Sequence, residues 1–275
     1  MNSSLFVTTS FSFLRLDVDT GMSYCLHHGG GLYYGITRSA NNIFVAARHR
    51  LVSSDTPSED ECGVILVFDK TLREVGRLIA TFPLRDMHEI KWHRGALWIT
   101  CSFDNMVAIF DGKKWHKWYP LGEPTEEPYD RNHFNSLMFE KDRLWVLAHN
   151  KGPSTLLAFD LNTLMPVEQV ELGNQAHNIW REHNELFVCS SGESKIVGIE
   201  GFELETGGFP RGIVHHNGNR YIGISELSER KDRDFTTGVI LVYNENWEFE
   251  KKIELPGEGL VLDLMPYQAN FFDER

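Results

Sequence analysis

The feature that most constrains the fold of this chain is a strand–turn–strand unit that recurs along its length. In each copy an apolar residue is followed seven or eight positions later by a second apolar segment, such as residues 97–99 (Leu-Trp-Ile) or 144–146 (Leu-Trp-Val). A polar or glycine-bearing turn, such as residues 93–95, separates the two, and this arrangement predicts a β-hairpin. The apolar residues that anchor the copies are Ile36, Ile90, Leu137, Ile179, Ile213 and Leu260.

A second hairpin follows most copies of the first. Its opening strand ends in an acidic or amide residue, and these residues are Asp69, Asp111, Asp160 and Asn244. Such side chains suit a turn because they accept hydrogen bonds from backbone N–H groups two residues further on. Each unit therefore contains four short antiparallel strands. The anchors lie roughly 34–54 residues apart, which is the spacing typical of β-propeller blades.

Six anchors predict an all-β, six-bladed β-propeller formed by a single domain over residues 1–275. Residues 259–264 read as an innermost strand with no following partner, whereas residues 5–26 supply three strands that lack an innermost one. Joining the two ends in one shared blade would close the ring and remove an exposed sheet edge. A seven-bladed ring and an irregular β-sandwich are the alternatives.

Composition excludes several classes of partner. The chain has 27 Lys and Arg residues against 39 Asp and Glu residues, and its formal net charge is −12. Such an acidic chain has no general affinity for nucleic acid or an anionic membrane, and no apolar stretch reaches the ~20 residues that cross a bilayer. The four cysteines are scattered, and the N-terminal segment lacks the features of a secretory signal, so we expect a cytoplasmic protein.

The blade pattern resembles the six-bladed propellers of the strictosidine synthase-like, gluconolactonase-like and NHL-repeat groups. The resemblance covers the whole chain as architecture and matches no single characterised family. Among NHL-repeat propellers, the amidating lyases hold zinc through histidines of their inner strands, with an arginine and a tyrosine nearby. The resemblance therefore implies that inner-strand histidines are candidate metal ligands here.

Polar residues occupy one equivalent position at the start of the predicted inner strands. Two positions before the anchors stand Tyr34, His88, Asn135, His177, Arg211 and Glu258. A further histidine, His133, lies two residues before Asn135 and on the same side of its strand. Because inner strands converge on the central channel, we expect His88, His133 and His177 to meet there and hold a divalent metal, Zn²⁺ rather than Fe²⁺. The alternative is that these histidines only form hydrogen bonds across a water-filled channel.

The other polar residues suggest roles around such a metal. The guanidinium of Arg211 can donate paired hydrogen bonds to an anionic group. Tyr34 or Glu258 can transfer a proton. Plain channel lining by Tyr34 and an ion pair between Arg211 and Glu258 are the structural alternatives. Residues predicted to contact substrate, or to support the metal, are Asn135, His149, Arg211 and Glu226.

These residues together predict a metal-dependent enzyme of the lyase or hydrolase type. Its substrate would be a small polar or anionic molecule bound at the mouth of the channel. The alternative is a non-catalytic propeller that binds a small ligand or a protein partner, since the fold alone does not determine activity.

Overall fold

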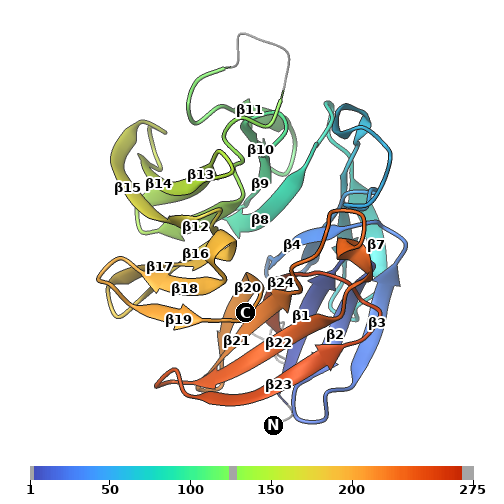
Figure 1. The fold of residues 1–275 in the computed structure, drawn as a ribbon. Helices are drawn as coiled ribbons and strands as arrows, with labels where there is room; N and C mark the ends of the chain where they lie inside the picture. The colour runs from blue at the N-terminus through green and yellow to red at the C-terminus, as the bar shows by residue number, and fades with distance from the viewer. Residues whose placement is uncertain (1–2, 124–128, 268–275) are drawn as a thin grey trace. The chain divides into compact units, whose positions relative to one another are not determined.

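The computed structural model describes residues 3–123 and 129–267, and the regular secondary structure of this part of the chain is almost entirely β-strand (Figure 1). The described residues form twenty-four strands in six four-stranded antiparallel sheets. The fold is therefore an all-β six-bladed propeller, as the repeat predicts. In the described residues, no helix is both long and apolar enough to cross a membrane.

The strands follow the chain in order. The first seven are β1 (Ser4–Thr9), β2 (Ser12–Asp17), β3 (Ser23–His28), β4 (Tyr33–Arg38), β5 (Ile43–Ala47), β6 (Val64–Phe68) and β7 (Glu74–Leu78). The next eight are β8 (Met87–His93), β9 (Ala96–Cys101), β10 (Met106–Phe110), β11 (Trp115–Trp118), β12 (Ser136–Glu140), β13 (Arg143–His149), β14 (Pro153–Asp160) and β15 (Pro166–Asn174). The last nine are β16 (His177–Glu182), β17 (Glu185–Ser190), β18 (Lys195–Gly198), β19 (Glu203–Glu205), β20 (Phe209–His216), β21 (Asn219–Ser225), β22 (Gly238–Asn244), β23 (Phe249–Leu255) and β24 (Val261–Tyr267). Three short 3-10 helices are η1 (Ser58–Asp60), η2 (Ser191–Glu193) and η3 (Arg233–Phe235).

The chain divides into two compact units, each of which is described by itself. One unit comprises residues 1–80 and 211–275, and the other comprises residues 81–210. The first unit contains the sheets β4–β7 and β20–β23 together with the sheet β24-β1-β2-β3, although β20 begins two residues before the boundary. The second contains the sheets β8–β11, β12–β15 and β16–β19. The single domain predicted over residues 1–275 stays a prediction.

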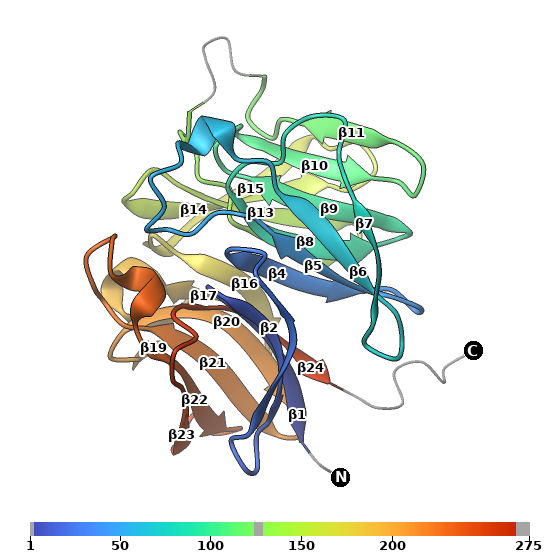
Figure 2. The ribbon, with the colours of Figure 1, turned by 90° about the vertical axis from the view of Figure 1, so that its right-hand side faces the viewer.

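One sheet of the first unit joins the two ends of the chain. Strands β24 and β1 lie side by side (Figure 2). They pair antiparallel, with Leu5 opposite Pro266 and Val7 opposite Leu264. Because β24 lies at the edge of this sheet, Pro266 removes no hydrogen bond from an interior strand. The predicted shared blade is thus confirmed.

Strand β1 shows why this sheet is stable. Side chains alternate across a strand, and in β1 both faces are apolar. Leu5 and Val7 are fully buried in a cluster with Tyr221 of the sheet β20–β23. Phe6 is buried on the other face, in a cluster with Tyr33 of the sheet β4–β7. The sheet β24-β1-β2-β3 is therefore packed against apolar side chains on both of its faces within its unit.

The middle sheet of the second unit follows the same rule. Trp145 and Leu147 of β13 pack in one cluster with Val188 of β17. Leu144 and Val146 pack in a different cluster, which also contains residues of the sheet β8–β11. Trp145 is fully buried and packs between sheets, so it is not a surface platform for binding.

The acidic and amide residues that end the third strands act as turn formers, as predicted. The Oδ1 atoms of Asp69 and Asp160 accept hydrogen bonds from the backbone N–H groups two residues on, at 2.8 and 3.0 Å. The N–H of Thr163 and the other hydrogen bonds in its turn hold the pKa of Asp160 below its usual value. These turns are therefore specified by local sequence.

Gly212 in β20 provides a test of the packing between two sheets of the first unit. Its φ is +68°, and a Cβ atom there would lie 2.9 Å from the Cα of Asp263 in β24. Gly257 has a similar φ of +79° but no atom within 4 Å of its missing Cβ. We expect Gly257→Ala to lower the free energy of unfolding by about 1–2 kcal/mol through backbone strain. Gly212→Ala should cost roughly 1–3 kcal/mol more through the added clash.

Urea denaturation of both variants, followed by tryptophan fluorescence, measures this difference. Equal losses of stability in the two variants would show that the close approach between β20 and β24 does not constrain the fold.

Candidate functional site

The candidate site begins at irregularities in two inner strands of the second unit. In β8 the pairing with β9 shifts between Met87 and Ile90, and in β16 the pairing with β17 shifts between His177 and Ile179. A β-bulge redirects side chains at the point where it interrupts the ladder. His88 lies inside the first irregularity and His177 borders the second, so each side chain is redirected as its strand begins.

Left-handed backbone conformations precede these strands at one equivalent position. Asp86, His133 and Gln175 have φ values of +52°, +44° and +44°. Each lies two residues before the inner-strand position, which is held by His88, Asn135 and His177 respectively. His88 and His177 thus occupy the inner-strand position of their segments. His133 instead occupies the left-handed position of its segment. His133 therefore joins the other two from outside a strand: β12 begins at Ser136, so the expectation that His133 and Asn135 share one side of a strand is wrong.

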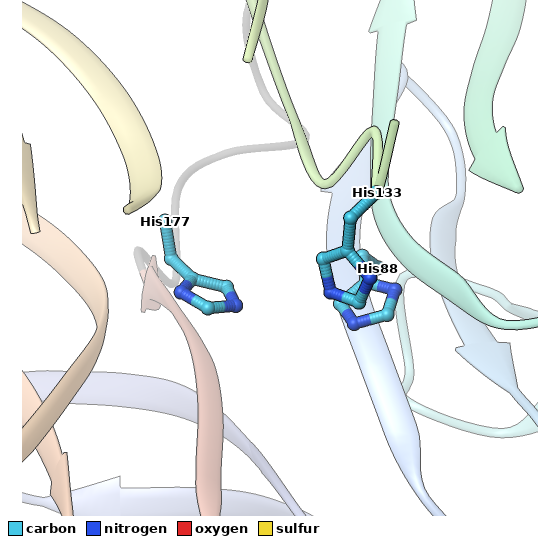
Figure 3. A group of neighbouring side chains, drawn as sticks. All are labelled: His88, His133 and His177. Carbon is cyan, nitrogen blue, oxygen red and sulfur yellow. The ribbon is translucent and has the colours of Figure 1, made fainter. Parts of the chain in front are cut away.

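The three histidines come together as the sequence predicts. One ligand nitrogen from each of His88, His133 and His177 lies within 4.8 Å of the others (Figure 3). The ring centroid of His88 is 4.5 Å from that of His133 and 6.2 Å from that of His177. His88 and His177 are buried, and His133 is half-buried. This arrangement can hold a metal ion.

Hydrogen bonds define the protonation of His88. Its Nδ1 lies 2.9 Å from the backbone carbonyl oxygen of Asp86, which can only accept, so Nδ1 carries the proton. The same nitrogen lies 3.0 Å from the Oγ of Ser102, whose hydroxyl donates to the carbonyl of Phe134 at 2.7 Å. In the neutral ring, the lone pair therefore belongs to Nε2.

A serine hydroxyl orients His177 in the same way. Its Nδ1 lies 2.9 Å from the Oγ of Ser191, and that hydroxyl donates to the carbonyl of Pro210 at 2.7 Å. Because the hydroxyl proton is already donated, the oxygen accepts from Nδ1–H, and Nε2 keeps its lone pair. Both serines follow directly after the second strand of their sheet, at the end of β9 and of β17.

A carboxylate holds the third ring. The Nδ1 of His133 lies 2.6 Å from an oxygen of Asp130, which is half-buried. A ligating histidine that donates its other N–H to a carboxylate, a carbonyl or a similar acceptor is characteristic of metal sites, because the acceptor fixes the tautomer and the orientation of the ring. Asp86, Asp130 and His133 form a second group with metal-ligand spacing. The short bond from His133 to Asp130 assigns this carboxylate to orienting the ring.

A fourth histidine borders the cluster. The ring of His149, the last residue of β13, lies 4.4 Å from the ring of His133 and 6.0 Å from that of His177, centroid to centroid. Asn135, two residues after His133, is also buried. Its side-chain amide donates a hydrogen bond to the carbonyl of Ala176 at 2.7 Å. The substrate-binding roles predicted for His149 and Asn135 stay predictions.

The remaining predicted residues belong to the first unit. Arg211 donates a hydrogen bond to the hydroxyl of Tyr34, which is buried. Glu258 instead accepts a hydrogen bond from the hydroxyl of Thr9 at 3.0 Å. Glu226 is exposed. The catalytic and substrate-binding roles of Tyr34, Arg211, Glu258 and Glu226 stay predictions.

Sequence reasoning missed a buried ion pair in the first unit. Arg48 donates two hydrogen bonds to the carboxylate of Glu61, at 2.7 and 2.6 Å, and both side chains are buried. The guanidinium of Arg48 also lies 5.4 Å from the ring centroid of Tyr34. This pair links the residue that directly follows the second strand, β5, to the segment between β5 and β6. Only the position of Arg48 at the end of a second strand gave a signal for it.

Sequence reasoning also missed the acceptors that orient the histidines. Ser102 and Ser191 directly follow the second strands of their sheets. Because the two strands of a hairpin run in opposite directions, a residue at the end of the second strand lies at the same end of the sheet as the start of the inner strand. That placement was the available signal, although it does not say which hydroxyl meets which ring. Asp130 stands before the predicted inner strand of Leu137, at a position that the repeat does not mark.

Neither a protein-family model nor a curated protein matches the sequence. Solved structures similar in fold include a chain of the nidogen/laminin complex, with a TM-score of 0.69, 8% identity, and coverage of 97% of this chain and 99% of that one. A protein of unknown function from Bacteroides caccae is similar with a TM-score of 0.68, 12% identity and the same coverage. A protein from Lactobacillus plantarum is similar with a TM-score of 0.57, 10% identity and the same coverage. At these identities, the likeness extends to the propeller fold alone.

The bond between His133 and Asp130 predicts how strongly a metal is held. Replacing Asp130 by Asn removes the charge behind the ring while keeping an acceptor of similar shape. We expect Asp130→Asn to weaken metal affinity roughly 10–100-fold, as measured by competition with a chromophoric zinc chelator.

Asp111→Asn is the matched control, because Asp111 accepts from the exposed ring of His116 at 2.9 Å in the same unit. That variant should bind metal as the wild type does. An affinity of Asp130→Asn equal to the wild type would show that Asp130 does not support the histidine.

Proposed function

We propose that this protein is a metal-dependent enzyme of the hydrolase or lyase type, whose metal is held by His88, His133 and His177. The observation that carries the proposal is the convergence of three ligand nitrogens within 4.8 Å, with the Nδ1 of each ring hydrogen-bonded to an acceptor. Three imidazoles oriented in this way match the ligand set of catalytic zinc sites. We therefore expect Zn²⁺ rather than Fe²⁺.

The number and type of ligands support a catalytic site over a structural one. Structural zinc sites are closed by four protein ligands, whereas catalytic sites use three and leave a position open for water or substrate. A zinc ion at this centre would lower the pKa of bound water and polarise a carbonyl oxygen. The residues of the chain supply the rest: they orient the ligands and, because His88 and His177 are buried, they shield the centre from bulk water.

The proposed substrate is a small polar molecule with an oxygen that can enter the open position. Hydrolysis and elimination both use such a centre, so the proposal includes both reaction types. It does not depend on the roles predicted for Tyr34, Arg211 and Glu258 in the first unit.

Metal content tests the proposal. Wild-type protein made without a polyhistidine tag and loaded with Zn²⁺ should retain about one zinc per chain after desalting, as elemental mass spectrometry measures it. His177→Ala should lose most of this zinc because a ligand is removed. His116→Ala, which changes an exposed histidine of the same unit, should keep it, and circular dichroism verifies that each variant is folded.

Activity provides the second readout. The zinc-loaded wild type should hydrolyse a small ester such as 4-nitrophenyl acetate faster than the same protein stripped by a chelator, and His177→Ala should match the stripped protein. Folded wild-type protein that takes up neither Zn²⁺ nor Fe²⁺ would contradict the proposal. That result would favour the propeller that binds a ligand or partner without catalysis.

A further inference from the structure

We infer that His149 is a hydrogen-bond donor to a substrate oxygen at the metal centre, and not a fourth metal ligand. The inference rests on the proposed function and adds the substrate class: a molecule that presents a carboxylate or carbonyl oxygen to the centre. It comes from the proton on the His149 ring, which the surrounding hydrogen bonds locate.

The backbone fixes the tautomer of His149. The N–H of Lys151 donates to the Nδ1 of His149 at 3.2 Å. Because an amide N–H can only donate, Nδ1 must hold the lone pair, and the neutral ring carries its proton on Nε2. This is the reverse of His88 and His177, whose Nδ1 atoms donate. A protonated ring nitrogen has no lone pair for a metal, so His149 presents a donor where the other rings present acceptors.

The ring of His149 lies beside the cluster, with its centroid 4.4 Å from that of His133. His149 ends β13, and its own N–H donates to the carbonyl of Asn132 at 2.8 Å, which ties it to the segment that carries His133. Lys151 has a left-handed φ of +56°, and its N–H points to the ring. Since Nδ1 faces this turn, Nε2 lies on the other side of the ring. The residue is 7% exposed, and its Nε2 is a buried atom.

The chemistry of this arrangement selects oxygen ligands that carry or gain negative charge. Three nitrogen lone pairs would hold the cation, and one nearby N–H could donate to a substrate oxygen at the same centre. A donor placed beforehand in a water-poor site favours a carboxylate, or a carbonyl that becomes an oxyanion during reaction. A fourth nitrogen ligand would instead close the open position.

Acetate binding to cobalt-loaded protein tests the inference, because Co²⁺ in a zinc site gives a visible spectrum that changes with its ligands. Three proteins are compared: the wild type, His149→Gln and His149→Met. The amide nitrogen of Gln can take the place of Nε2–H, whereas Met has similar length without a donor. All three should bind about one cobalt per chain with similar spectra before acetate is added.

We expect acetate to bind roughly tenfold more weakly to His149→Met than to the wild type. His149→Gln should recover most of this loss, which a merely structural role of the ring would not predict. Equal acetate affinity in all three proteins would overturn the inference, as would a wild type whose cobalt spectrum does not respond to acetate.

The other outcomes separate this inference from the proposed function. Loss of cobalt or a changed spectrum in His149→Met before acetate is added would make His149 a ligand, which overturns the inference but leaves a metal site. A folded wild type that binds no cobalt would overturn both.

Discussion

The structure depends on strands that are buried on both faces. In a sheet with one wet face, alternate residues are polar. In β1 and β13, successive side chains instead enter two different apolar clusters, one on each side of the sheet. At about 25 cal/mol per Å² of apolar surface removed from water, this two-sided burial is the main stabilising term. It also leaves little freedom for the backbone to shift, so the ends of the strands are held in fixed positions.

Fixed strand ends explain how the histidine cluster can exist. Polar rings brought together in a protein interior need hydrogen-bond acceptors, and these come from residues directly after two second strands and from the segment before the inner strand β12. The hydroxyls of Ser102 and Ser191 each accept a hydrogen bond from a histidine ring while donating one to a carbonyl oxygen. The carboxylate of Asp130 accepts a hydrogen bond from the third ring. The left-handed residues Asp86 and His133 carry a conformational cost, which the surrounding packing must offset. Strain of this kind is common where a backbone holds functional side chains.

The sequence predicted the architecture well because a propeller repeats its own pattern. Hairpin turns, turn-forming Asp residues and the pairing of the two chain ends all follow from local residue types at regular spacing. The meeting of His88 and His177 was predictable for the same reason, since they occupy equivalent positions. The inclusion of His133 depends on a left-handed residue that no periodicity reveals. The partners Asp130, Ser102 and Ser191 depend on side-chain directions, and these become known only when neighbouring sheets are placed.

The pairing of β1 with β24 has a consequence for how the protein is made. Within most sheets, the strands that pair are neighbours in sequence and can meet as soon as both have been synthesised. Leu5 and Pro266 are opposite each other, so β1 must wait while the strands β2–β23 are synthesised before its partner leaves the ribosome. During that interval its unpaired edge is open to other nascent chains, and sheet edges of this kind promote aggregation. In a propeller that closes in this way, the edge of β1 is exposed until the final pairing step. The finished ring then covers that edge.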